Sequence, residues 1–300
     1  MEARPPETPR LRPLGVGDIV DRVFALYKAR PLLFLALSAI PYLLLVGIVA
    51  VLAVALGLST GLFELLSDLE AGRTPAVQGM AARIVAFGLF VLVVIVAAVV
   101  ILSAQSAALI DATAAVYLGR PTSFGQAFRN GLRASPRVIG AGLLLFLGLI
   151  AAWTVLVVVM AISQEVLVAI VGVIVGMVVT AYILTSTLVM PVAATVEGAG
   201  PLSALRRSWV LSEGNRWRVL GLQLLLLILN AVISTLLSVL FIGALIGDDT
   251  TRTVIQQVVN VVANVAWAPV QWGTFTVLYY DLRVRREAYD LQLAAEALPR

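Results

Sequence analysis

The chain has 300 residues, of which 61% are hydrophobic and 13% are charged, and its mean hydropathy is +1.01. Soluble domains are about 45–50% apolar and about 25% charged, so this composition excludes a water-soluble globular protein. The chain contains neither Cys nor His, which excludes disulfides and the commonest catalytic base and transition-metal ligand. The formal net charge is +4, and the cations lie beside apolar runs. This pattern favours a membrane surface over nucleic acid as their partner.

Six apolar runs follow one another along the chain, near residues 32–58, 84–109, 138–162, 166–195, 219–246 and 254–280. A helix that crosses a bilayer needs about 20 mainly apolar residues, and none of the runs alternates strictly as a barrel strand does. The sequence therefore predicts an all-α, multi-pass fold with six transmembrane helices in one domain, residues 14–282. A disordered tail, 1–13, precedes this domain, and a C-terminal tail, 283–300, follows it.

Lys and Arg are distributed unevenly between the connections that join the runs. Of the 21 such residues, only Arg73, Arg83 and Arg252 fall in the connections that follow the first, third and fifth runs. Connections on the cytoplasmic side of membrane proteins carry the excess of positive charge. We therefore expect both termini to lie in the cytoplasm.

A short amphipathic stretch precedes each odd-numbered run. Each stretch has an apolar face and a basic face, and the candidate binding cations are Arg22, Lys28, Arg129, Arg133, Arg206 and Arg207. Ser123 and Gln126 have the spacing of a capping box, and Pro201 suits the first turn of a helix. We expect three short interfacial helices on the cytoplasmic side. They either lie in the membrane surface as anchors, or their cations bind anionic lipid headgroups or a cytoplasmic protein.

The unit of amphipathic stretch, run, external turn and returning run occurs three times. Aligning Pro31 with Pro136 also aligns Ile19 with Phe124, whereas the third copy fits only approximately. We hypothesise a threefold internal repeat of helix pairs about an axis along the membrane normal, an arrangement known among transporters.

Polar side chains within the last two runs form a candidate intramembrane site. Its amides are Gln223 and Asn230 on the fifth run, and Gln256, Asn260, Asn264 and Gln271 at spacings that place them on one face of the sixth. A polar side chain in lipid is costly, so this face should point into the bundle or towards water. The amides either join helices by hydrogen bonds or line a polar path or a headgroup pocket.

Asp111 lies within the second run, near its cytoplasmic end, and completes the candidate intramembrane site. We expect it to pair with Arg120 or another nearby arginine; the alternative is a role in an intramembrane hydrolase. No Ser has a His base, no carboxylates cluster at metal-ligand spacing, and no phosphate-binding loop is present. We therefore expect no enzymatic activity, no metal and no cofactor.

Four segments carry a resemblance to a known family: RPLGVGDIVDR from Arg12, GRPTSFGQAF from Gly119, EGAGPLSALRRSW from Glu197 and YYDLRVRRE from Tyr279. In this order they resemble the bacterial membrane domains of glycerophosphoryl diester phosphodiesterase. The resemblance implies a six-helix protein of the bacterial inner membrane. The resemblance also implies that, in relatives in which such a membrane domain is fused to an enzyme, the phosphodiesterase chemistry belongs to a separate barrel domain with His, carboxylates and a metal. A barrel needs about 250 residues, and we expect the membrane module alone here.

Two hypotheses of function follow. The first is a non-enzymatic membrane module that interacts with lipids or acts as a scaffold, alone or as a homo-oligomer. Its partners would be membrane lipids with anionic headgroups or a cytoplasmic protein, and not nucleic acid. The alternative is a transporter or permease for a small solute or a lipid, which uses the polar faces of the fourth to sixth runs.

Overall fold

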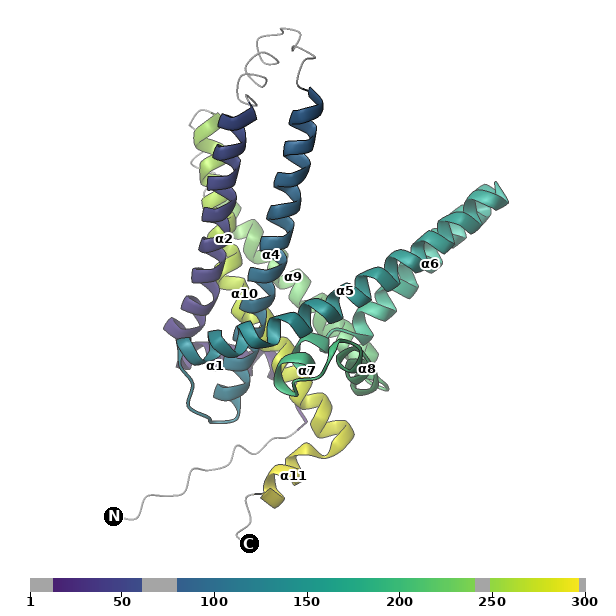
Figure 1. The fold of residues 1–300 in the computed structure, drawn as a ribbon. Coiled ribbons are helices and arrows are strands. Elements are labelled where there is room, and N and C mark those ends of the chain that lie inside the picture. The colour runs from purple at the N-terminus through teal and green to yellow at the C-terminus, as the bar shows by residue number, and fades with distance from the viewer. Residues whose placement is uncertain (1–12, 61–79, 241–248, 297–300) are drawn as a thin grey trace.

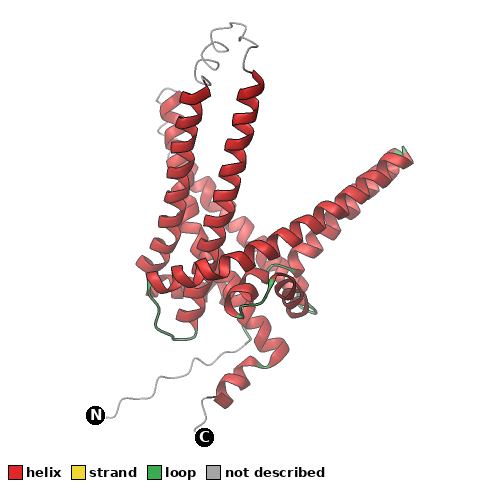
Figure 2. Cartoon of the chain, viewed as in Figure 1, coloured by secondary structure: helices red, strands yellow, loops and turns green. Residues whose placement is uncertain are grey.

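The computed structural model describes residues 13–60, 80–240 and 249–296, and every regular element in these ranges is a helix (Figure 1 and Figure 2). In chain order the helices are α1 (Val16–Ala29), α2 (Pro31–Thr60), α4 (Met80–Tyr117), α5 (Phe124–Ser163), α6 (Val166–Ser186), α7 (Met190–Val196), α8 (Pro201–Ser212), α9 (Arg216–Leu240), α10 (Asp249–Glu287) and α11 (Tyr289–Glu296). The predicted all-α class is confirmed.

Six helical segments are long and apolar enough to cross a membrane: α2, α4, α5, α6 together with α7, α9 and α10. The predicted multi-pass architecture is confirmed. Residues 241–246 of the predicted fifth run and residues 1–12 of the predicted N-terminal tail lie outside the described residues.

The six segments form three helix pairs, α2 with α4, α5 with α6, and α9 with α10, which extend from a common end of the molecule (Figure 1). The α5–α6 pair runs away from α2 and α4 at a steep angle. No residue in the most apolar stretch of α4, α5 or α6 is buried. Such bare apolar surfaces are stable only in a lipid environment or under another chain. The threefold axis that would relate the pairs stays a prediction.

The core lies at the end of the molecule from which the pairs extend. We call this end the helical base: α1, α7, α8, the start of α9 and the adjoining ends of α4, α5 and α10. Its fully buried side chains include Ile19 from α1, Leu211 from α8, and Leu278 and Tyr279 from α10. The amphipathic segments therefore bury their apolar faces against the ends of the long helices.

The second amphipathic stretch is not a separate interfacial helix, contrary to the sequence-based expectation. It forms the first turns of α5, which continues through Pro136 to Ser163. A proline removes one hydrogen bond from a helix, and Asn and Gly commonly end helices, yet α5 continues through Asn130, Gly131 and Pro136. By contrast, α8 is separated from α9 by a turn in which Gly214 has a φ of +76°. The Oγ of Ser123 accepts the amide hydrogen of Gln126 at 3.4 Å, which is the N-cap half of the predicted capping box.

The predicted fourth run contains a break instead of one continuous helix. The α6 helix ends at Ser186, and α7 begins three residues after Thr187, with Pro191 in its first turn. Proline cannot donate the hydrogen bond that would continue the helix through this point. The hydroxyl of Ser208 on α8 donates to the carbonyl of Ser186 at 3.0 Å, so the break also joins α6 to the helical base.

Glycines allow two pairs of helices to approach closely. A Cβ atom at Gly131 of α5 would lie 2.6 Å from the carbonyl oxygen of Ala104 on α4. In the α5–α6 pair the neighbours are side chains: a Cβ atom at Gly172 would lie 2.8 Å from the sulfur of Met160, and one at Gly176 would lie 2.6 Å from a methyl group of Leu156. The two glycines, four residues apart on α6, therefore allow α6 to pack closely against α5.

Candidate functional site

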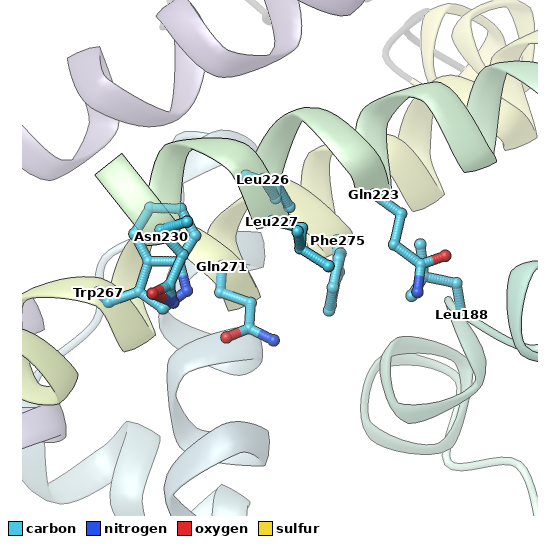
Figure 3. A pocket seen from close by; sticks show the side chains of 9 residues that line it. Leu188, Gln223, Leu226, Leu227, Asn230, Trp267, Gln271 and Phe275 are labelled. Carbon is cyan, nitrogen blue, oxygen red and sulfur yellow. The ribbon is translucent and has the colours of Figure 1, made fainter. Parts of the chain in front are cut away.

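A polar pocket lies between α9 and α10, beside the break that follows α6. Its volume is about 530 Å³. Gln223 and Asn230 enter from α9 and Gln271 from α10, and Trp267 and Phe275 supply aromatic surface (Figure 3). The structure thus brings together three of the six amides that the sequence predicts for an intramembrane site.

The hydrogen bonds of this pocket are incomplete. The Oε1 atom of Gln223 is buried and has no hydrogen-bond partner among the described residues. Asn230 accepts a hydrogen bond from the hydroxyl of Ser234 at 3.1 Å, within α9. A buried acceptor without a donor costs about 1–3 kcal/mol, so the amide of Gln223 favours a neighbouring group that donates a hydrogen bond. Because amides carry no formal charge, a neutral hydroxyl or amide group suits it better than an ion.

The other amides of α10 lie further from the helical base. Asn264 borders a small cavity together with Asn230 and Ser234, and its Nδ2 donates to the carbonyl of Asn260 at 2.8 Å. Gln256, Asn260 and Asn264 are exposed. The face therefore does not lie inside the bundle along its whole length, because burial along α10 decreases away from the base. That these three amides point towards water stays a prediction.

Asp111 does not belong to this pocket. Its carboxylate, on α4, accepts a hydrogen bond from the Nδ2 of Asn130 on α5 at 3.2 Å. The expected ion pair with Arg120 is not present among the described residues. No group of three metal-ligating side chains occurs in the described part of the chain. Asp111 therefore joins two helices at the base.

The predicted binding cations lie in different places on the helical base. Lys28, Arg129 and Arg133 are exposed, and none of them forms an ion pair within residues 13–60, 80–240 and 249–296. Arg22 is also exposed, and its guanidinium lies 5.7 Å from the ring centre of Tyr117. The end of α1 is tied to the start of α5, because Arg30 donates to the carbonyl of Thr122 at 3.1 Å.

The neighbours Arg206 and Arg207 have different environments. Arg207 donates from Nε and Nη2 to Glu197 at 3.0 and 2.9 Å, and it also pairs with Glu287. The hydrogen bonds to Glu287 and Glu197 raise the pKa of the Arg207 guanidinium above its usual value despite partial burial. Arg206 is exposed and has no ion pair among the described residues; it borders a groove between α5, α6 and α8. Of these two neighbours, only Arg206 remains available for a ligand.

An ion-pair network that was not predicted from the sequence holds the base together. The buried carboxylate of Asp281 accepts the amide hydrogen of Leu14 at 2.7 Å and pairs with Arg218 and Arg285, each at 3.1 Å. Tyr279 donates a hydrogen bond to Glu197, which Arg207 also contacts. The spacing of Asp281 and Arg285, four residues apart on a helix, was the available signal.

The family described as Domain of unknown function (DUF7847) matches residues 33–282. The chain belongs to this family. The DUF7847 region contains the polar pocket, Glu197, Arg207 and Asp281, whereas α1 and Arg285 lie outside it. Neither a curated protein nor a solved structure matches the chain.

Proposed function

We propose that this DUF7847 chain is a non-enzymatic membrane module that binds anionic phospholipids at its helical base. In this proposal the base faces the cytoplasm of a bacterium and the three helix pairs cross the inner membrane. The observation that carries it is the exposure of Arg129 and Arg133 on α5, without ion pairs in the described chain, at the end where the bare apolar helices begin.

The charges of the base support this proposal because they divide into two groups. Arg207, Arg218 and Arg285 are neutralised by carboxylates within the protein. Arg129 and Arg133 have no such partner among the described residues. A cation close to an anionic membrane surface contributes about 1 kcal/mol to binding.

The four sequence segments described above support a second part of the proposal. We propose kinship with the membrane domains of glycerophosphoryl diester phosphodiesterases, on the strength of the order of these segments. Three of the segments supply residues of the Asp281 and Arg207 networks, so the motifs coincide with the packing of the base. Binding of phospholipid headgroups agrees with a module that accompanies enzymes of phosphodiester chemistry.

The proposal is tested in vesicles that contain spin-labelled phosphatidylglycerol or phosphatidylcholine. We expect the wild-type chain to immobilise phosphatidylglycerol with a preference of about fivefold, the equivalent of about 1 kcal/mol. The double variant Arg129→Gln/Arg133→Gln should lose most of this preference. The matched variant Arg129→Lys/Arg133→Lys keeps both charges and should retain it. Equal immobilisation of the two lipids by the wild-type chain would contradict the proposal.

A second candidate function, transport of a neutral hydroxylated solute, is favoured by the unpartnered Oε1 of Gln223 in the polar pocket. This hypothesis expects glycerol flux into proteoliposomes above that of protein-free vesicles, measured by light scattering after an osmotic step. Gln223→Leu should abolish the flux, because it removes the acceptor, whereas Gln256→Leu changes an exposed amide outside the pocket and should not. Identical flux in all three proteins would leave packing as the role of the amides.

A further inference from the structure

A groove of about 540 Å³ lies in the angle between α8 and the α5–α6 pair. Its walls are apolar and include Leu145 and Leu149 from α5, Ile183 from α6, and Leu202 and Leu205 from α8. The volume falls within the range of about 300–1,000 Å³ that is typical of ligand sites. The groove is continuous with exposed apolar residues of α5, such as Leu144, so a molecule can enter it sideways from the membrane.

One end of the groove carries a positive charge. Arg206 is the cation among the lining residues, and it has no ion pair in the described ranges, although Arg207 next to it contacts two carboxylates. Thr187 also lines the groove, but its hydroxyl donates to the carbonyl of Ile183 at the end of α6, at 2.8 Å. This hydroxyl hydrogen is therefore not offered to the groove. The lining of the apolar groove thus includes one guanidinium, that of Arg206, without an ion pair among the described residues.

Trp209 borders the groove beside this guanidinium and is held in place by its neighbours. Its ring lies edge-on to that of Tyr182, with 5.6 Å between centres, and the guanidinium of Arg216 lies 5.0 Å from the Trp209 ring centre. Tryptophan is enriched at the level of lipid headgroups. This end of the groove therefore has the character of a membrane interface, and the leucine-lined end has that of the acyl region.

We infer that the groove binds one acyl chain of an anionic phospholipid, with Arg206 in contact with the headgroup. The inference deepens the proposed function and rests on it, but it concerns residues other than Arg129 and Arg133. A soluble anion would not require the apolar groove, whereas a neutral hydrocarbon chain would not require the cation. A phospholipid of the surrounding leaflet satisfies both, and guanidinium groups bind phosphate through strong, charge-assisted hydrogen bonds.

Two glycines of α5 provide a matched pair of variants. Gly148 lines the groove, and a Cβ atom added there meets no atom within 4 Å, so Gly148→Leu fills the groove without displacing a neighbour near the backbone. Gly142 is equally open at its Cβ position but does not line the groove. Both substitutions replace glycine by a better helix former, so any difference between them reports on the groove.

The experiment uses phosphatidylcholine vesicles that contain photoactivatable phosphatidylglycerol with a diazirine on its acyl chain. After illumination, mass spectrometry should locate the label on residues 144–149 and 202–209 of the wild-type chain and of Gly142→Leu. Gly148→Leu should lower this labelling about tenfold, the factor expected for lost contact with about two methylene groups. Arg206→Gln should make photoactivatable phosphatidylcholine label the groove as strongly as phosphatidylglycerol does.

Two results would overturn the inference. One is labelling of Gly148→Leu at the wild-type level, and the other is equal labelling of the wild-type groove by the two lipids. If either occurs while the spin-label preference that depends on Arg129 and Arg133 persists, the groove site fails and the proposed function stands. If that preference is absent as well, both fail.

Discussion

At the scale of single residues, the side chain of Asp281 is buried and faces the guanidinium groups of Arg218 and Arg285. Arg218 also donates to the carbonyl of Leu14, whose amide hydrogen binds Asp281. One carboxylate therefore connects the segment before α1, the start of α9 and the end of α10. Because the carboxylate is enclosed, its loss would leave a partly buried cation without compensation.

We predict that Asp281→Asn lowers the free energy of unfolding by about 3–5 kcal/mol, the cost of breaking a buried ion pair from one side. Glu213→Gln is the matched control, since the Glu213 side chain is 61% exposed and pairs with Arg286 at 2.6 Å. A surface pair of this kind contributes at most about 1 kcal/mol. Titration of the protein in mild detergent with sodium dodecyl sulfate measures both changes in the free energy of unfolding. Equal losses in the two variants would contradict the role of Asp281 as a buried ion-pair partner.

The sequence predicts on which face of a helix a site residue lies better than it predicts which residues that side chain contacts. Gln223, Asn230 and Gln271 share a pocket as the helical spacing suggests, because spacing fixes the face of a helix. Arg206 and Arg207 could not be distinguished, since the carboxylates that bind Arg207 lie 10 residues before it and 80 residues after it. Contacts between distant segments depend on how helices pack, and one sequence does not contain that information directly.

At the scale of the helices, the crossing of α4 and α5 depends on Gly131. Its backbone approaches Ala104 and Ala108 so closely that a Cβ atom would lie 2.6 Å from backbone atoms of both. Backbone atoms cannot rotate away as the end of a side chain can. The two helices must therefore separate if this position carries a side chain.

We predict that Gly131→Ala destabilises the protein by about 1–3 kcal/mol through overpacking. Gly125→Ala, in the first turn of the same helix, has open space around its Cβ and should raise stability by less than about 1 kcal/mol. Thermal unfolding in detergent should place the midpoint of Gly131→Ala below that of the wild-type chain and of Gly125→Ala. Superimposable curves for all three proteins would show that the crossing tolerates separation.

Helix existence was more predictable than helix continuity. Apolar runs of sufficient length identify the spanning segments because the bilayer sets that length. Continuity depends on single residues: α5 passes through Pro136, whereas the fourth segment breaks ahead of Pro191. The break is stabilised by Ser208, which lies on α8 and is invisible to a local reading of the sequence.

At the scale of the whole molecule, the helix pairs share a buried core at the base and expose apolar residues along their length. The amphipathic segments and the ends that carry most of the cations lie at this same end (Figure 1). Composition and charge distribution predict that apolar surface and cations lie in different parts of the molecule, because lipid accepts apolar surface and the headgroup region accepts cations. The steep angle between the pairs was not predictable, since packing at the base sets it.

Native mass spectrometry of the chain, extracted in mild detergent with the lipids of its host membrane, measures which phospholipids remain bound to it. We predict that the wild-type chain retains anionic phospholipids in preference to zwitterionic ones, because Arg129 and Arg133 are exposed without ion pairs in the described chain. The Arg129→Gln/Arg133→Gln variant should retain fewer of them, and the corresponding double lysine variant should match the wild-type chain. A wild-type chain that carries no lipid, or carries the two lipid classes in the proportions of the membrane, would contradict the account.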